Sequence, residues 1–250
     1  MFKVGSYVTR KKYDNDILFK IIEIKNNIVI LHGVDLRLIA DADINDLKLS
    51  TIKKTKDNIF LNRYIDTKEY FYIPGSILHI DSDVDYLNRC MEFYKKEKIK
   101  CYGYIFKENE YPDIIKKLIL KHNPNIVVIT GHDAYYKKDN IYKNSKYFIE
   151  STKIIRKINH SLIIIAGACQ SNFEELIKSG ASFASSPSRV NIHALDPAII
   201  ASYISKYDFN KIIDLKDILS KTKFGRNGFG GIEINGQMLK GLPRKDKNWI

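Results

Sequence analysis

Short, continuously apolar runs separated by helical patterns constrain the fold of this chain most strongly. The clearest runs are residues 126–130 (Ile-Val-Val-Ile-Thr) and 162–166 (Leu-Ile-Ile-Ile-Ala). A strand without polar alternation is typical of a parallel sheet that helices cover on both faces. Residues 76–80, 101–106 and 180–184 are predicted to be further strands of this sheet. Strands that alternate with helices predict βαβ units, and therefore an α/β fold with right-handed crossovers.

Helical spacing of apolar residues fills the segments between and after these strands. The predicted helices span residues 84–98, 112–121, 147–159, 172–179, 197–207 and 211–221. Pro112 suits the first turn of one helix, and Asn172 is a suitable cap for another. Near the end of the chain, Asn235-Gly236 lies between two apolar runs, which predicts a hairpin at that point.

The first fifty residues follow a different pattern. Short β-rich runs at residues 7–10, 17–24 and 28–31 are separated by turn clusters rich in Asn and Asp. We therefore expect a small SH3-like β-barrel module over residues 1–52, a linker over residues 53–73, and one α/β domain over residues 74–250.

Composition excludes several classes of protein. The net charge is +12, from 41 Lys+Arg against 29 Asp+Glu, but the lysines are scattered, so a solvated surface is expected and nucleic acid is not an expected partner. Three cysteines cannot form a disulfide scaffold, and they suit the reducing cytoplasm. No run of 18 apolar residues is present, so no membrane-spanning helix is predicted.

The residues that follow each predicted strand are the candidates for chemistry, because ligands of open parallel sheets bind outside the carboxyl ends of the strands. His132 follows the strand at 126–130, and Cys169 follows the strand at 162–166. If these strands are neighbours, the imidazole and the thiol face one cleft. A Cys–His pair of this kind is what thiol nucleophilic catalysis requires.

Backbone amides near these two residues are candidates for an oxyanion hole. The amide of Cys169 precedes a predicted helix, and the second donor is the amide of Gly131 or of Asp133. The sequence does not decide between those two.

Other chemistries fit less well. A zinc site of Cys169, His132 and His193 lacks any recognised ligand spacing, so we expect no metal and no cofactor. The glycines of residues 225–231 follow a helix rather than a strand, which does not suit dinucleotide binding. A receiver domain with a phospho-accepting Asp81 or Asp83 would leave His132 and Cys169 unexplained.

The two strand-end segments, Thr-Gly-His-Asp at 130–133 and Ala-Gly-Ala-Cys-Gln at 166–170, resemble the His and Cys blocks of caspase-like cysteine peptidases. With the long block at 185–197, the chain resembles the YabG family of sporulation peptidases over nearly its full length. The resemblance implies a caspase-like three-layer domain and a cysteine endopeptidase with His132 and Cys169 as the dyad, acting through a thioester acyl-enzyme. It also implies spore coat proteins and spore protein precursors as substrates, in the mother-cell cytoplasm or at the spore coat.

The resemblance further implies cleavage after Arg, whose guanidinium needs a carboxylate. Clostripain-like enzymes place an acid two residues before the cysteine, but Gly167 stands there in this chain. The candidate carboxylates are therefore Asp83, which we favour, then Asp81 and Asp196. Ser185 and Ser186, after the strand at 180–184, are candidates for binding the substrate backbone.

A rival hypothesis comes from a different functional class. In it, the chain is a non-catalytic adaptor, in which an SH3-like module and an inactive peptidase fold bind coat proteins or nucleic acid.

Overall fold

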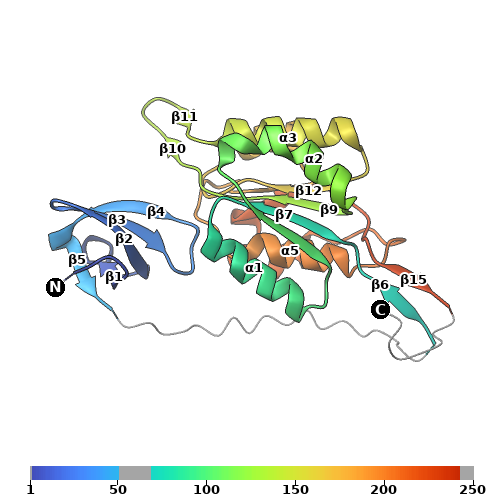
Figure 1. The fold of residues 1–250 in the computed structure, drawn as a ribbon, viewed down its shortest axis with the longest axis horizontal. Coiled ribbons are helices and arrows are strands. Elements are labelled where there is room, and N and C mark those ends of the chain that lie inside the picture. Colours follow the sequence, from blue (N-terminus) through green and yellow to red (C-terminus); the bar gives the residue numbers. More distant parts are fainter. Residues whose placement is uncertain (1, 51–68, 243–250) are drawn as a thin grey trace. The chain divides into compact units, whose positions relative to one another are not determined.

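The computed structural model describes residues 2–50 and 69–242 of the chain. They belong to two compact units, Met1–Phe60 and Leu61–Ile250 (Figure 1). The predicted module boundary near residue 52 and most of the predicted linker lie outside the described residues.

The first unit is a five-stranded antiparallel sheet with the order β4-β3-β2-β1-β5. Its strands are β1 (Tyr7–Arg10), β2 (Phe19–Lys25), β3 (Ile28–Gly33), β4 (Ile39–Asp43) and β5 (Leu47–Leu49), with short 3-10 turns at Lys11–Tyr13 and Ile44–Asp46. Alternate residues of the strands, among them Val8, Phe19, Ile21 and Leu31, form its buried core. The β-rich character that the sequence predicts for this region is confirmed.

The second unit is α/β and contains a six-stranded sheet with the order β14-β13-β12-β9-β7-β8. Its strands are β7 (Ile77–Asp81), β8 (Cys101–Ile105), β9 (Ile126–Ile129), β12 (Ile163–Ala166), β13 (Phe183–Ser185) and β14 (Phe229–Gly231). The first five pair in parallel, and only β14 runs antiparallel to its neighbour. The predicted parallel sheet is therefore confirmed, with one antiparallel strand added at an edge.

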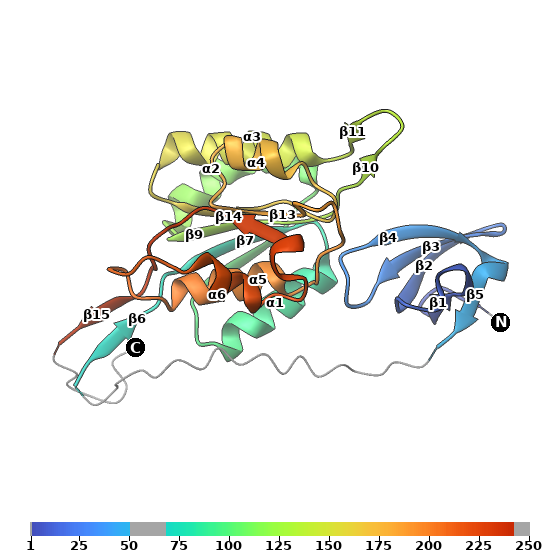
Figure 2. The ribbon, with the colours of Figure 1, turned by 180° about the vertical axis from the view of Figure 1, so that it is seen from behind.

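Helices cover both faces of this sheet. They are α1 (Val84–Lys96), α2 (Tyr111–His122), α3 (Ser145–Ile158), α4 (Phe173–Lys178), α5 (Asp196–Ser205) and α6 (Leu215–Ser220), with 3-10 turns at Glu108–Glu110 and Gly225–Asn227. Helices α2, α3 and α4 lie on one face and α1, α5 and α6 on the other (Figures 1 and 2). The six helices match those that the apolar spacing predicts, and none of those described is long and apolar enough to cross a membrane.

The strand order fixes where the chain changes direction across the sheet. After β7 the chain adds β8 on one side, and it then crosses back to place β9 on the other side of β7. The crossovers on the two sides use opposite faces, which is why α1 and α2 lie on opposite faces of the sheet. The carboxyl ends of β7 and β9 therefore flank a topological switch point, where ligands of open α/β sheets bind.

The sheet is buried because both faces are apolar. Leu78, Ile80, Val127 and Ile129 belong to a core cluster that includes residues of α2 and α3. On the opposite side, all ten residues of α5 are buried. This double coverage explains the uninterrupted apolar runs of the sequence.

The predicted hairpin at Asn235-Gly236 is wrong. Strand β14 pairs with β13, and β15 (Leu239–Gly241) pairs instead with β6 (Phe71–Ile73), which lies at the end of the predicted linker. A Cβ on Gly236 would collide with the backbone of Tyr207 and Asp208. The glycine thus serves close packing against that backbone rather than a tight turn.

A further small ribbon joins β10 (Tyr135–Tyr136) and β11 (Ile141–Tyr142).

Arg156, near the end of α3, ties this helix to the segments that lead into two core strands. Its guanidinium donates to the carbonyl oxygens of Gly180 (2.6 Å), His160 (2.9 Å) and Leu162, and to Ser182 Oγ (3.0 Å). Burial lowers the pKa of the guanidinium. The four acceptors are neutral, so the interaction is a set of hydrogen bonds rather than an ion pair.

We expect Arg156→Met to lower the free energy of unfolding by about 2–4 kcal/mol, because the part-buried carbonyls of Gly180 and Leu162 and the Ser182 hydroxyl lose their donor. The loss should be the same at low and high salt, since no opposite charge is involved. Urea unfolding followed by circular dichroism measures both effects, with the exposed Lys153→Met on the same helix as control. A loss below about 0.5 kcal/mol would contradict this role for Arg156.

Candidate active site

The pairing of β9 with β12 brings the His132 and Cys169 segments to one edge of the sheet. Ile129 is in register with Ala166, and the amide of Gly167 donates to the Ile129 carbonyl at 3.1 Å. The segments 130–133 and 167–170 therefore leave neighbouring strands at the same level. The sequence left open whether these two strands are neighbours, and the pairing of β9 with β12 shows that they are.

Asp133 joins these two segments to the start of α3. Its Oδ1 accepts hydrogen bonds from the amides of Ala134 (2.9 Å) and Asn144 (2.7 Å). Its Oδ2 accepts from the hydroxyls of Ser145 and Ser171, the latter at 2.9 Å. The Asp133 carboxylate thus fixes the His132 segment against the segment that follows Cys169.

Cys169 lies where β12 turns toward α4, and it is 2% exposed. The amide of Ile192 donates to its Sγ at 3.3 Å, so part of the segment after β13 packs against the sulfur. Asn172 caps α4 by accepting a hydrogen bond from the amide of Glu175, as the sequence predicts. The position of the thiol is therefore set by a helix start on one side and by the Ile192 segment on the other.

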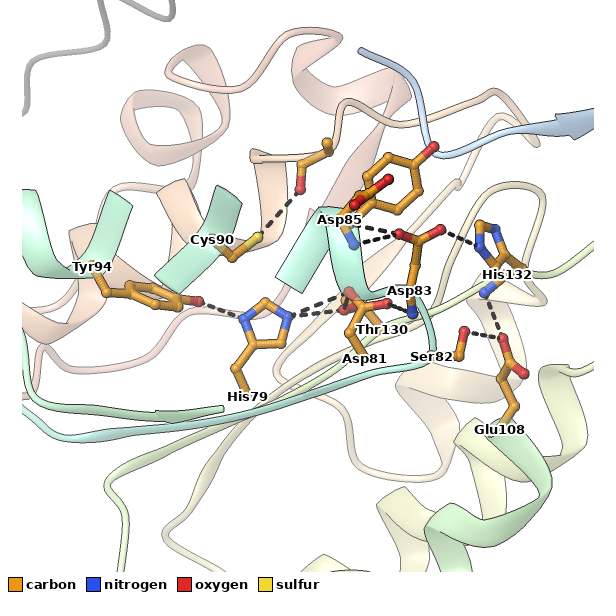
Figure 3. A network of polar contacts seen from close by, with 12 residues as sticks. His79, Asp81, Ser82, Asp83, Asp85, Cys90, Tyr94, Glu108, Thr130 and His132 are labelled. Carbon is orange, nitrogen blue, oxygen red and sulfur yellow. Dashed lines mark hydrogen bonds and ion pairs between the residues drawn. The ribbon is translucent and has the colours of Figure 1, made fainter. Parts of the chain in front are cut away.

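His132 is held through its amide, its carbonyl and its ring, and Figure 3 shows the contacts with Glu108 and Asp83. Its amide donates to Glu108 Oε1 at 2.7 Å, and its carbonyl accepts from Asn144 Nδ2 at 2.8 Å. Its ring Nε2 lies 3.0 Å from Asp83 Oδ2. The ring also packs near Tyr86, with 5.8 Å between the ring centroids. Both the backbone and the ring of His132 are therefore oriented by the protein.

Two glycines in these segments are required by close contacts. A Cβ on Gly131 would lie 2.7 Å from both Glu108 Oε1 and Ser82 Oγ. Gly167 has a φ of +106°, and a Cβ there would collide with Ser185 Oγ. The sequence indicates small residues at these positions, and the structure gives the reason for each.

The amides proposed for an oxyanion hole occupy the expected edge. Within residues 69–242, the described part of this unit, the amides of Gly131 and Asp133 donate no hydrogen bond to another residue. The neighbouring amide of His132, in contrast, is bound to Glu108. Gly131 and Asp133 both remain candidates for the second donor.

The three carboxylates predicted to bind a substrate Arg are each engaged within the protein. Asp81 is fully buried and accepts from Thr130 Oγ1 at 2.6 Å. Asp196 is also buried and accepts from the amides of His193 (3.2 Å) and Lys223 (2.9 Å). Asp83 is the only one of the three that is not fully buried.

The two serines predicted to bind substrate backbone also make internal contacts. Ser185 Oγ donates to the Ala168 carbonyl at 2.7 Å. Ser186 Oγ donates to the Val190 carbonyl at 2.8 Å and accepts from the amide of Gln170 at 3.0 Å. These hydroxyls connect the end of β13 to the Cys169 segment, and their role toward substrate stays a prediction.

The other two cysteines lie elsewhere in the α/β unit, Cys90 buried and Cys101 partly buried. Cys90 is buried in α1 and donates to the Ala194 carbonyl at 3.5 Å. Burial strongly raises the pKa of the Cys101 thiol on β8, which disfavours its thiolate. Among the cysteines, only Cys169 follows a strand at the carboxyl edge of the sheet.

Sequence reasoning did not identify Glu108 and Asn144, although both hold His132. Glu108 follows β8, and Asn144 precedes α3. The rule that selects residues after strand ends would have found Glu108, because β8 is parallel to β7. No sequence signal marks Asn144, whose contact depends on how the β10–β11 ribbon returns to the site.

Comparisons with known proteins identify relatives of the whole chain. The family described as YabG peptidase U57 matches residues 3–64 and 52–243. The Sporulation-specific protease YabG of Bacillus subtilis (strain 168) is 41% identical over 286 aligned residues, which cover 98% of this chain and 99% of the relative.

Similarity to solved structures is weak. Two Listeria proteins described as cystathionine beta-lyases involved in aluminium resistance, from L. monocytogenes and L. innocua, align with 14% identity and TM-scores of 0.33 and 0.34. Each alignment covers 62% of this chain and 40% of the other. Similarity at this level does not establish a shared fold or function.

Burial raises the pKa of Asp133 above its ordinary value of 3.8, although the hydroxyls and amides around it favour the charged form. The folded protein therefore binds this proton more tightly than the unfolded chain does. Between pH 3.8 and the raised value, the contribution of this group to stability falls as the pH rises.

We expect the wild type to lose stability relative to Asp133→Asn as the pH rises from about 4 toward neutrality. The unfolding free energy of the wild type minus that of the variant should therefore fall over this range. Ser171→Ala removes a hydroxyl that favours the ionised carboxylate, so in that background the fall should be larger. Urea titrations at a series of pH values measure both differences. A difference that rises with pH would contradict the assignment.

Proposed function

Because the chain belongs to the YabG peptidase family, and is therefore a protease, we propose that it is a cysteine endopeptidase with Cys169 as nucleophile and His132 as general acid and base. The observation that carries this proposal is the adjacency of β9 and β12, whose carboxyl ends lead into the two residues. The Asp133–Ser171 hydrogen bond, which joins the two segments, supports it further. Membership of a peptidase family favours catalysis over the non-catalytic adaptor.

We also propose a caspase-like domain for the second unit and an SH3-like module for the first. A parallel sheet between two helical layers, with His after its third strand along the chain and Cys after its fourth, supports a caspase-like domain. The short antiparallel sheet of the first unit supports an SH3-like module, for which we propose a role in docking. The second unit then carries all of the residues proposed for catalysis.

The proposed reaction needs no cofactor. The Cys169 thiol gives its proton to His132, and the sulfur forms a bond to the carbonyl carbon of the scissile peptide. His132 then protonates the leaving amine as the C–N bond breaks, which leaves a thioester. Water, deprotonated by His132, attacks the thioester and the sulfur regains its proton. Backbone amides of Cys169 and of Gly131 or Asp133 would bind the oxyanion.

Access to the sulfur requires a movement. At 2% exposure, Cys169 is not open to a peptide, and the Ile192 amide lies against it. We propose that residues 187–192 move away when substrate binds as an extended strand beside the sheet. The internal contacts of Ser186 would be exchanged for contacts with the substrate backbone in this step.

The substrates proposed are spore coat proteins and spore protein precursors, in the cytoplasm of the mother cell or at the spore coat. The name of the Bacillus subtilis relative, a sporulation-specific protease, supports a role in sporulation. Cleavage after Arg is proposed from the family resemblance. Of the candidate acids, Asp83 is the most accessible, but its Oδ2 already faces His132.

We expect Cys169→Ala and His132→Ala to lower the cleavage rate by roughly 10³-fold or more, because each removes a group that forms or breaks bonds. The assay incubates an unfolded, Arg-containing protein with the enzyme and identifies the cleavage sites by mass spectrometry. The wild type should cut after Arg. Cys101→Ala, the same chemical change on β8, should retain activity.

Two results would overturn the assignment of the dyad. One is cleavage by Cys169→Ala at the wild-type rate. The other is an absence of cleavage by the wild type and the variant alike.

A further inference from the structure

We propose that Asp83 positions His132 for proton transfer, so that the site works as a Cys169–His132–Asp83 triad; this inference rests on the proposed function. The Asp83 carboxylate faces the His132 ring (Figure 3), with 3.0 Å between Asp83 Oδ2 and His132 Nε2. The two side chains are 9% and 20% exposed. At such low exposure a charged hydrogen bond is stronger than it would be in water. Asp83 is thus a positioning residue rather than the carboxylate that binds a substrate Arg.

Asp83 is itself rigidly held. Its Oδ1 accepts from the amides of Asp85 (3.0 Å) and Tyr86 (3.1 Å), which makes it the N-cap of α1. Its amide donates to Asp81 Oδ1 at 3.0 Å. One oxygen is therefore committed to the helix, and the other faces the imidazole.

A buried chain of hydrogen bonds supports Asp81 in turn. Thr130 Oγ1 donates to Asp81 Oδ2, so the hydroxyl must accept from His79 Nε2 at 2.9 Å. His79 then carries its proton on Nε2, and its Nδ1 accepts from the Tyr94 hydroxyl at 2.9 Å. His79, Asp81 and Thr130 are fully buried. This chain joins the ends of β7 and β9, from which Asp83 and His132 extend.

The contact with Asp83 decides which nitrogen of His132 can act as the base. A carboxylate at Nε2 favours the tautomer with its proton on Nε2, because that N–H can donate to it. The lone pair then lies on Nδ1, which accepts the thiol proton. The same carboxylate stabilises the imidazolium that forms after the transfer.

Asp83→Asn tests this role without removing the helix cap. The two helix amides need an acceptor, so the carboxamide oxygen of the substituted side chain must take the place of Oδ1. The NH₂ group of the same carboxamide then faces His132 Nε2 and donates to it. The imidazole is then forced into the opposite tautomer, with its proton on Nδ1. In that tautomer Nδ1 has no lone pair with which to accept the thiol proton.

We expect Asp83→Asn to lower kcat by roughly 10²–10⁴-fold, with little change in KM and with the preference for Arg retained. ¹⁵N spectra of the imidazole should show the proton on Nε2 in the wild type and on Nδ1 in the variant. Asp214→Asn is the matched control, because Asp214 caps α6 through the amides of Lys216 and Asp217. It should keep the wild-type kcat.

The possible outcomes separate the hypotheses. An Asp83→Asn enzyme with wild-type kcat, or with an unchanged tautomer, overturns the triad. Loss of the Arg preference with a raised KM and an unchanged kcat overturns it in favour of substrate binding by Asp83. Activity that survives Cys169→Ala would instead overturn the proposed function itself, so the two failures are distinguishable.

Discussion

The parallel register of β7, β9 and β12 is the constraint on which the rest of the site depends. Ile129 stands level with Ile80 on one side and with Ala166 on the other. The segments that carry Asp83, His132 and Cys169 therefore leave the sheet at one edge, in adjacent positions. This register is fixed by apolar side chains buried on both faces, since a slip would move them out of their packing sites.

Polar side chains then convert this edge into a rigid frame. Burying the carboxylates of Asp81 and Asp133 is costly, and hydrogen bonds from hydroxyls and amides offset that cost. These bonds join consecutive strand ends to each other and to the starts of α1 and α3. These hydrogen bonds hold His132 in place, whereas Cys169 is covered by the Ile192 segment. In this account, activation is a movement of that segment rather than a rearrangement of the base.

The sequence was sufficient to predict the main strands and helices, because apolar runs and helical spacing report burial directly. It also predicted that His132 and Cys169 each follow a strand, but it left open whether those strands are neighbours. It could not predict that Asp83 faces His132, since that contact depends on β9 crossing back to the far side of β7. The prediction of a hairpin at Asn235-Gly236 was wrong because Gly236 packs closely against the backbone of Tyr207 and does not form a tight turn. The residues that hold His132 are set by tertiary contacts, which local patterns do not report.

Every step of the proposed reaction depends on the Cys169 sulfur as the nucleophile. A peptidyl chloromethyl ketone with Arg at its reactive end identifies this nucleophile, because the reagent alkylates a nucleophilic group that its peptide brings within reach. We expect one covalent adduct, located on Cys169 by peptide mass spectrometry, with loss of activity in proportion to labelling. An adduct on another residue that abolishes activity, or full activity in protein labelled at Cys169, would contradict it.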